Sequence, residues 1–360
     1  MGNDLILITG ASGMIGFRTL VDVLEAGYQV RAAVRNEDSF AKISSLPSVQ
    51  PYLSQLSSII VPDITIPGAY DEAVQGAKYI IHVASPLAGN TAGDDYESTI
   101  IQPAIQGTLG ILQSSLKSST VKRIVITASV ASIASGPRPD PTEPINGENA
   151  GLRLFDPAIK HANTLLEHTT TVIPTAPFAN QMVAYTSSKA LSHQATNTFI
   201  ADNKPAFDVI NILPTFVIGR DETVTDAKNI GKGTNGLLMR PLLGLVEEYP
   251  QHNATVHVDD VARMHLAALD PKIAGGQDFL AAGPDFGVTN WAESLELIKK
   301  RYPKAHADGL FNSNAIAKPA PTITKVDSGK ASSELGIKFK TSEEQVISVV
   351  EHYLELVGHK

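Results

Sequence analysis

The feature that most constrains this chain is a glycine-rich turn close to its start. The apolar run Leu5–Thr9 leads directly into Gly10, and further glycines stand at positions 13 and 16, where a helical pattern begins. Glycines at this spacing allow a tight turn, a close approach of backbone to a pyrophosphate and close helix–strand packing. The helix N-terminus adds unpaired N–H groups and a partial positive charge. We therefore expect a dinucleotide to bind at Gly10, Ser12, Gly13, Met14, Ile15 and Gly16.

Short apolar runs alternate with helical patterns, which is typical of parallel strands that are buried on both faces of a sheet. Right-handed crossovers would make this sheet doubly wound. The expected strands are Leu5–Thr9, Gln29–Val34, Ser58–Val61, Tyr79–Val83, Arg123–Thr127, Phe207–Leu213, Val256–Val258 and Asp278–Ala281. The expected helices are Met14–Ala26, Thr99–Leu116, Ala184–Ala201, Asp259–Leu269, Asn290–Tyr302 and Ser342–Leu356, whereas residues 215–255 look irregular.

This order of elements predicts an α/β fold with a Rossmann-type doubly wound parallel sheet and a small, discontinuous C-terminal substrate lobe. Residues 1–214 and 257–282 would form the dinucleotide-binding domain. Residues 215–256 and 283–360 would form the substrate-binding lobe.

Composition excludes several classes of function. The 360 residues include 29 basic and 37 acidic ones, so no basic surplus is available to neutralise a nucleic acid. The absence of Cys excludes disulfides, thiolate nucleophiles and Cys-ligated metals, and the histidines are too scattered to suggest a metal site. No signal peptide or membrane-length apolar run is apparent, so we expect a cytoplasmic protein without a membrane partner.

The end of the second strand indicates which dinucleotide binds. An acidic residue there would hydrogen-bond the ribose 2′-hydroxyl of NAD, but Arg35 occupies the place and Lys42 follows on the next helical pattern. A guanidinium suits a 2′-phosphate, so NADP(H) is favoured as the cofactor. The neighbouring acidic residues Glu37 and Asp38 leave a mixed use of NAD open.

Tyr185 and Lys189 stand four residues apart on a predicted helix, which places both side chains on one face. A free phenol is a poor base at neutral pH, and a neighbouring ammonium is expected to lower its pKa. Ser129, just after the fifth strand, could bind the same substrate oxygen. A Tyr–Lys pair alone also fits a surface helix, but together with the glycine turn it indicates catalysis. His82 and His257 end apolar runs and are expected to be core residues.

With these motifs the chain resembles an extended short-chain dehydrogenase/reductase over nearly its whole length. Within that superfamily it is most similar to the branch of dihydroflavonol reductases, cinnamoyl-CoA reductases and fungal or yeast aldehyde and ketone reductases. The further segments that carry the resemblance are Ile81–Pro86, Pro103–Thr108, Ile212–Gly219, His257–Ala262 with His265, and Lys325–Asp327 with Lys330 and Leu335–Ile337.

The resemblance implies that Ser129, Tyr185 and Lys189 form a catalytic triad. Tyr185 would protonate a carbonyl oxygen while hydride leaves the nicotinamide, and Lys189 would also bind the nicotinamide ribose. Asp63 and Ile64 would flank the adenine. Further cofactor contacts are expected from Ala84, Ser85, Thr127, Pro214 and Val217, and substrate contacts from Pro86, Val130, Phe178, Thr215 and Phe216.

The chain departs from the family pattern in two places. Gln106 stands where related enzymes often carry Asn, which puts a proton relay through that side chain in doubt. The step from Ser129 to Tyr185 is also longer than the family leads us to expect, and it contains a Pro-rich insertion at about 136–181. We hypothesise that this insertion is a substrate lid; the alternative is a surface excursion remote from the substrate.

The resulting expectation is an NADPH-dependent reductase that acts on a partly apolar ketone or aldehyde as a monomer or homodimer. A nucleotide-sugar epimerase or dehydratase is an alternative, although residues 214–256 carry too mixed a set of charges to favour binding of a diphosphate. A hydroxysteroid dehydrogenase is a further alternative. A non-catalytic NADP sensor is less favoured, because such proteins usually lack the Tyr–Lys pair.

Overall fold

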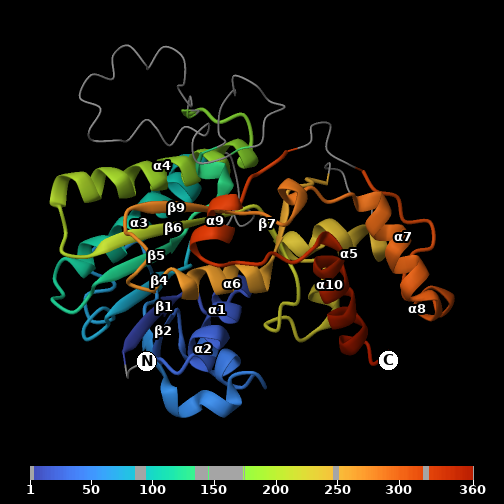
Figure 1. Cartoon of the computed structure of the whole chain (residues 1–360), viewed down its shortest axis with the longest axis horizontal. Helices are drawn as coiled ribbons and strands as arrows, with labels where there is room; N and C mark the ends of the chain where they lie inside the picture. Colours follow the sequence, from blue (N-terminus) through green and yellow to red (C-terminus); the bar gives the residue numbers. More distant parts are fainter. Residues whose placement is uncertain are drawn as a thin grey trace.

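The computed structural model describes residues 4–85, 95–133, 145, 173, 175–245, 251–318 and 324–359. Pro86 and most of the insertion expected at about 136–181 lie outside these residues. The lid hypothesis concerns that insertion, so it also lies outside what the structure describes. In Figure 1 a sheet covered by helices fills one half of the molecule, and a mainly helical lobe fills the other.

Seven strands form one parallel sheet in the order β3-β2-β1-β4-β5-β6-β9. The direction of winding reverses between β1 and β4, so the crevice beyond the carboxyl ends of these two strands is the ligand site of such a fold. This confirms the doubly wound Rossmann-type sheet. The strands are β1 (Leu5–Thr9), β2 (Gln29–Val34), β3 (Leu56–Ile60), β4 (Tyr79–His82), β5 (Arg123–Thr127), β6 (Asp208–Pro214) and β9 (Gln277–Ala281).

Helices cover both faces of the sheet (Figure 1). Because side chains alternate along a strand, Ile8 packs in the core beneath α1 (Met14–Glu25) and α6 (Val258–Ala267), with α2 (Glu37–Ser44) beside them. Leu7 points the other way, toward α3 (Gln102–Ser115) and α4 (Gln181–Asn203). A π-helical turn, Glu97–Ile101, leads into α3.

The lobe has an apolar core of its own, in which Leu238, Trp291 and Val349 pack together. Its elements are β7 (Phe216–Ile218), β8 (Thr255–His257), α5 (Gly236–Leu242), α7 (Trp291–Arg301), α8 (Pro303–Ala307) and α10 (Ser342–Leu356), while α9 (Gly329–Glu334) packs beside β9. Short 3₁₀-helices lie at Gln50–Gln55, Ala227–Asn229, Gly233–Asn235 and Asp285–Gly287. The expectation that residues 215–255 are irregular is wrong for β7 and α5, because three-residue strands and a helix containing Pro241 give no clear periodicity.

Ile145, which follows β5 in the chain, pairs with the C-terminal segment at Val326. Ile145 N donates to the Lys325 carbonyl at 2.8 Å, and Asp327 N donates to the Ile145 carbonyl at 2.8 Å. Ile145 also packs against Leu213 and Val326 in a small apolar cluster. The C-terminal segment around Val326 therefore holds Ile145 near the end of β6.

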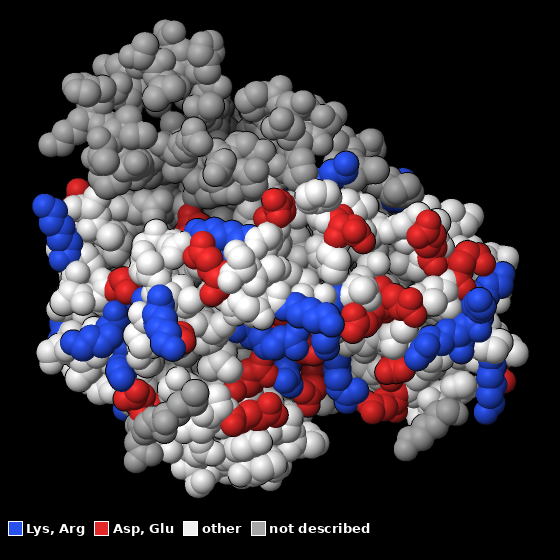
Figure 2. Space-filling model, in the orientation of Figure 1, with Lys and Arg blue, Asp and Glu red and all other residues white. Residues whose placement is uncertain are grey.

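Acidic and basic side chains lie interspersed over the described part of the face drawn in Figure 2. Among the helices of the described ranges, none is both long and apolar enough to span a bilayer. In the same part of the chain, no group of three His, Asp or Glu side chains is arranged to hold a metal ion.

Candidate active site

The glycine turn is built by two different steric demands. Gly10 has a φ of +73°, and a Cβ atom there would lie 2.7 Å from Ala84 N; one on Gly16 would lie 2.1 Å from the Gly10 carbonyl oxygen. Gly13 is different, because among described atoms its added Cβ would meet only that oxygen, at 3.7 Å. No side chain caps α1 at Gly13. The open space before uncapped N–H groups fits the pyrophosphate of a dinucleotide.

Arg35 follows β2 and Asp63 follows β3, so the neighbouring ends of two strands bring them together. Hydrogen bonds from Thr65, and to a smaller extent the charge of Arg35, lower the pKa of Asp63. Arg35 lies just before α2 and Lys42 lies within it, and both side chains are exposed. These positions agree with an adenosine 2′-phosphate site at this corner of the sheet.

Ile64 explains a glycine in the Pro103–Thr108 segment. A Cβ atom on Gly107 would lie 2.9 Å from Ile64 Cδ1, so the glycine gives the Ile64 side chain room beside α3. Ile64 follows Asp63 in the segment after β3. The adjacent Gln106 side chain is exposed.

Tyr185 and Lys189 lie on one face of α4, as their spacing predicts, with Lys189 Nζ 5.5 Å from the centre of the Tyr185 ring. Lys189 Nζ donates to Ser85 Oγ at 2.8 Å. Since Ser85 follows β4, this bond fastens α4 to the strand end beside the glycine turn. The structure therefore brings the expected catalytic pair to the expected cofactor crevice.

Burial changes the acid–base properties of both groups. It lowers the pKa of Lys189 to about 8 and raises the pKa of Tyr185. The pKa of Tyr185 is therefore raised and not lowered as expected, because the burial that disfavours the phenolate outweighs the effect of the neighbouring ammonium. Tyr185 is protonated at neutral pH, the state that a proton donor needs.

The lowered pKa of Lys189 predicts a pH dependence of stability. Since the unfolded chain binds more protons between pH 8 and 10.5, folding gains stability as pH rises through this window. The wild type should gain about 2 kcal/mol relative to Lys189→Met between pH 7 and pH 10, measured by urea unfolding. The exposed Lys300→Met is the control and should show no such trend. A difference between wild type and Lys189→Met that does not change with pH would contradict the prediction.

Ser129 stands between β5 and a single helical turn, Val130–Ser132, whose N-terminus it caps. Its Oγ accepts the N–H of Ala131 at 3.2 Å, which leaves the hydroxyl proton for another acceptor. The capped turn packs against α4. Ser129 is thus held on an element that contacts the helix carrying Tyr185.

Three other expected residues make bonds within the protein. The hydroxyl of Thr127 lies 2.7 Å from Nε2 of His265, whose Nδ1 lies 2.7 Å from the Val261 carbonyl. Thr215 donates through both N and Oγ1 to the Ala281 carbonyl, at 2.9 and 3.1 Å. Val217 is buried in β7. These residues support the site through backbone position and packing.

The expected substrate residues that are described are half-buried, apart from the buried Thr215. Val130 packs beside Leu213 in the small apolar cluster. Phe216 stacks on the ring of His252, with centroids 5.0 Å apart and planes at 9°. Phe178 is half-buried just before α4, and Pro214 ends β6.

Sequence reasoning missed Asn235, which joins the lobe to the glycine turn. Its side chain accepts from Gly219 N at 3.1 Å and donates to the Gly219 carbonyl at 2.7 Å. The same Nδ2 lies 3.9 Å from Met14 Sδ. No local pattern marks this residue, because its partners are distant in sequence.

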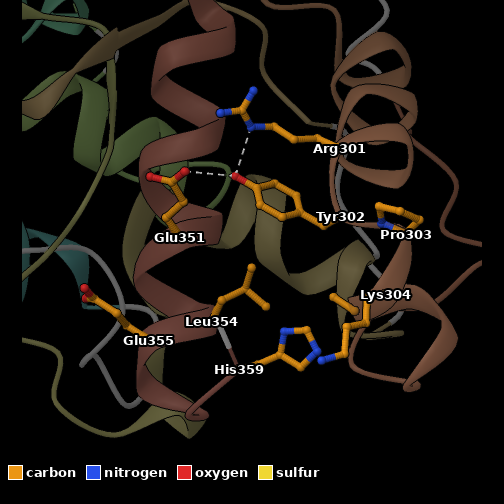
Figure 3. Close-up of a pocket in the computed structure, with 9 residues that line it drawn as sticks. Arg301, Tyr302, Pro303, Lys304, Glu351, Leu354, Glu355 and His359 are labelled. Carbon is orange, nitrogen blue, oxygen red and sulfur yellow. Dashed lines mark hydrogen bonds between the residues drawn. The ribbon is translucent and has the colours of Figure 1, made fainter.

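A separate cleft of about 440 Å³ lies in the lobe between α8 and α10 (Figure 3). Tyr302 donates to Glu351 there at 3.2 Å, and Glu355 pairs with Arg220 at 2.5 Å. None of the expected site residues lines it. The residues that line it are Arg301, Tyr302, Pro303, Lys304, Ala305, Glu351, Leu354, Glu355 and His359.

Comparisons with known proteins agree with this geometry. The family model described as the NAD dependent epimerase/dehydratase family matches residues 6–153. Ketoreductase CTB6 of Cercospora nicotianae is 34% identical over 99% of this chain and 96% of its own length. Ketoreductase sphI of Aspergillus fumigatus is 31% identical over 99% of this chain and its whole length.

Among solved structures, yeast methylglyoxal/isovaleraldehyde reductase Gre2, complexed with NADPH, superimposes with a TM-score of 0.76 at 21% identity. The match covers 99% of this chain and 100% of that chain. Together with the full-length relatives above 30% identity, this shows that the chain belongs to the NAD-dependent epimerase/dehydratase family of extended short-chain dehydrogenases/reductases.

Proposed function

We propose that this protein is an NADPH-dependent carbonyl reductase whose proton donor is Tyr185. The observation that carries the proposal is the placement of the Tyr185–Lys189 pair, through the bond from Lys189 to Ser85, beside the glycine turn. Two full-length relatives bear the name ketoreductase, and a structural neighbour was solved with NADPH, which supports the same reaction class.

The residues of the crevice suit both the pyrophosphate and the 2′-phosphate of NADPH. The uncapped start of α1 and the space before Gly13 would hold the pyrophosphate, and Arg35 with Lys42 the 2′-phosphate. When bound, the cofactor supplies the hydride for the carbonyl carbon. The protein supplies position and the proton.

The proton chemistry follows from burial and charge. The Ser129 hydroxyl donates a hydrogen bond to the substrate carbonyl oxygen and orients it toward Tyr185. Tyr185, protonated at neutral pH, gives its hydroxyl proton to that oxygen as the alcohol forms. The neighbouring Lys189 ammonium then stabilises the phenolate that remains.

The substrate would sit where the lobe meets the strand ends. Val130 and Phe216 offer apolar and aromatic surface there, which favours a partly apolar ketone or aldehyde. We assign the lobe, residues 215–256 and 283–360, to substrate binding. A cytoplasmic location and a monomeric or homodimeric state complete the proposal.

An epimerase acting on a nucleotide sugar would need cations to bind a diphosphate in the lobe. Arg220 is one such cation, but it forms an ion pair with Glu355 of α10. NADPH oxidation monitored across aldehydes, ketones and flavonoids separates these functions. We expect oxidation with at least one carbonyl class; cofactor binding without any oxidation would favour the epimerase or the sensor instead.

Removal of the Arg35 guanidinium tests the choice of cofactor. Arg35→Ala should weaken NADPH binding about tenfold and leave NADH binding nearly unchanged, because a charge-assisted contact to the 2′-phosphate is lost. Isothermal titration with both cofactors measures this. Arg31→Ala is a control, since Arg31 bonds the carbonyls of Ala73 and Gln75 instead. Equal losses for both cofactors in Arg35→Ala would refute the assignment.

A further inference from the structure

The short strand β7 lies where the sheet half of the molecule meets the lobe (Figure 1). It has three residues, Phe216–Ile218, and in the part of the chain that the structure describes its one neighbouring strand is β8. A sheet of two such short strands has little stability of its own. Since Phe216 is an expected substrate contact and Val217 an expected cofactor contact, the position of β7 needs support from outside this small sheet.

Polar side chains supply that support at three points of β7. At its start, Thr215 is bonded to the last carbonyl of β9 through both N and Oγ1. At its middle, Thr234 Oγ1 donates to the Val217 carbonyl. At its end, Asn235 accepts from Gly219 N at 3.1 Å and donates to the Gly219 carbonyl at 2.7 Å. Two of the three side chains, Thr234 and Asn235, are neighbours in the chain.

The peptide groups of Val217 face away from β8. Phe216 N donates to the Ala254 carbonyl at 3.0 Å, so the groups of Phe216 face β8 and those of the next residue face the other edge. The bond from Thr234 to the Val217 carbonyl lies at that edge. Among the described residues no partner is found for the Val217 N–H, which leaves a donor there for a ligand.

Asn235 leaves its local role unused. It stands at the N-cap of α5, where an asparagine side chain commonly accepts an N–H of its own helix, but it makes no such bond. The buried side chain turns instead to Gly219, 16 residues earlier in the chain. Its Nδ2 also lies 3.9 Å from Met14 Sδ. One amide group therefore connects the end of β7 to the start of α1.

Gly219 lets the end of β7 lie close to a second helix start. Its φ is +147°, and a Cβ atom there would lie 2.7 Å from Cγ1 of Val258, the first residue of α6. Met14 is the first residue of α1 and follows Gly13, where the pyrophosphate of the cofactor is expected. The starts of α1 and α6 and the end of β7 thus meet at Gly219 and Asn235.

We propose that Asn235 is a positioning residue for hydride transfer: it fixes the end of β7 against the first turn of α1, so that a nicotinamide beside Val217 keeps one orientation toward the carbonyl. The inference rests on the proposed carbonyl reductase activity. Thr234 supports the same strand at its middle. The two phosphate groups of the cofactor are assigned to other residues, Gly13 and Arg35, so loss of Asn235 should free the nicotinamide without releasing NADPH.

The first test needs no substrate. The wild type should raise the fluorescence of NADPH, because a nicotinamide ring held apart from the adenine is not quenched by it. Asn235→Ala should keep the dissociation constant of NADPH within a factor of about three and lose most of this gain. Thr234→Val has the same shape without the donor to Val217 and should lose part of it. A wild-type complex no more fluorescent than free NADPH would overturn the proposal.

The second test measures the chemical step with the carbonyl compound that the wild type reduces fastest. Asn235→Ala should lower the rate constant of single-turnover NADPH oxidation about tenfold, because a misplaced ring rarely reaches the carbonyl in the reactive geometry. With a prochiral ketone, the excess of one alcohol enantiomer should also fall. The amplitude counts folded enzyme and should stay. A purely structural role would lower the amplitude and leave the rate constant and the enantiomeric excess unchanged.

Asn253→Ala is the matched control. Asn253 is also a buried asparagine that bonds N and O of one distant residue, Thr324, at 3.1 Å each, but none of its described bonds reaches α1. Its loss should lower the thermal stability, as that of Asn235 does, and leave the fluorescence gain of NADPH unchanged.

The outcomes separate the two proposals. If the wild type reduces carbonyls and both Asn235→Ala and Thr234→Val keep its fluorescence gain and rate constant, the positioning role is wrong and the reductase assignment stands. An equal loss of fluorescence in Asn253→Ala would also refute the role, because any weakening of the lobe would then free the ring. If the wild type reduces no carbonyl, the proposed function fails, and the fluorescence still decides whether Asn235 holds the nicotinamide.

Discussion

Tyr185→Phe should lower kcat for carbonyl reduction about 1,000-fold while NADPH affinity stays within a factor of about two. The substitution removes one oxygen atom and leaves the ring that packs 5.5 Å from Lys189 Nζ. Phenylalanine keeps the apolar contacts of the half-buried ring, so the fold should remain intact. Single-turnover oxidation of NADPH, followed by its absorbance, separates the chemical step from cofactor binding.

Tyr353→Phe is the control for this loss. Tyr353 is a buried tyrosine in the apolar core of the lobe, so its replacement changes a similar environment far from Ser129 and Lys189. It should leave kcat unchanged. A Tyr185→Phe enzyme that retains most of its kcat would remove Tyr185 as the proton donor and with it the proposed mechanism.

Gly13→Asp should reduce NADPH affinity about 100-fold or more and leave the protein as stable as the wild type, or slightly more stable. Gly13 is the N-cap of α1, with φ −102° and ψ 168°, an extended conformation that suits an aspartate cap. The same carboxylate would stand where the pyrophosphate must lie, and like charges in contact cost several kcal/mol. Titration of NADPH and thermal unfolding of the apoprotein measure the two effects.

Gly16→Ala provides the contrast. Its Cβ atom would lie 2.1 Å from the Gly10 carbonyl oxygen, so the backbone of the turn must move. Stability and affinity should therefore fall together. If Gly13→Asp also lost both, its effect would come from misfolding, and the space before Gly13 would have no special relation to the cofactor.

Much of the sheet could be predicted because its signals are local. The strands β1, β2 and β5 have the predicted bounds, since each is a short apolar run between turn residues. The glycine turn and the Tyr185–Lys189 pair are also local patterns. By contrast, β3 begins at Leu56, before the predicted Ser58, because the half-buried start of that strand lacks a continuous apolar run.

The parts of the site that could not be predicted depend on register between distant strands. Asn211 bonds Asp278 only because β6 and β9 align side by side. Nothing in the separate segments shows this alignment. His193 lies 2.9 Å from Asp278, and its place one helical turn after Lys189 was the one local sign of this contact.

The lobe core has a consequence for how the chain folds as it is synthesised. Leu238 and Met239 of α5 reach the ribosome exit long before Val349 and Val350 of α10, yet all four pack in the same core. The Rossmann strands up to β6 can pair first, while the apolar face of α5 stays exposed until α10 has been synthesised. During this interval the nascent chain exposes an apolar surface that is prone to aggregation. Chaperone binding or rapid elongation would limit this exposure.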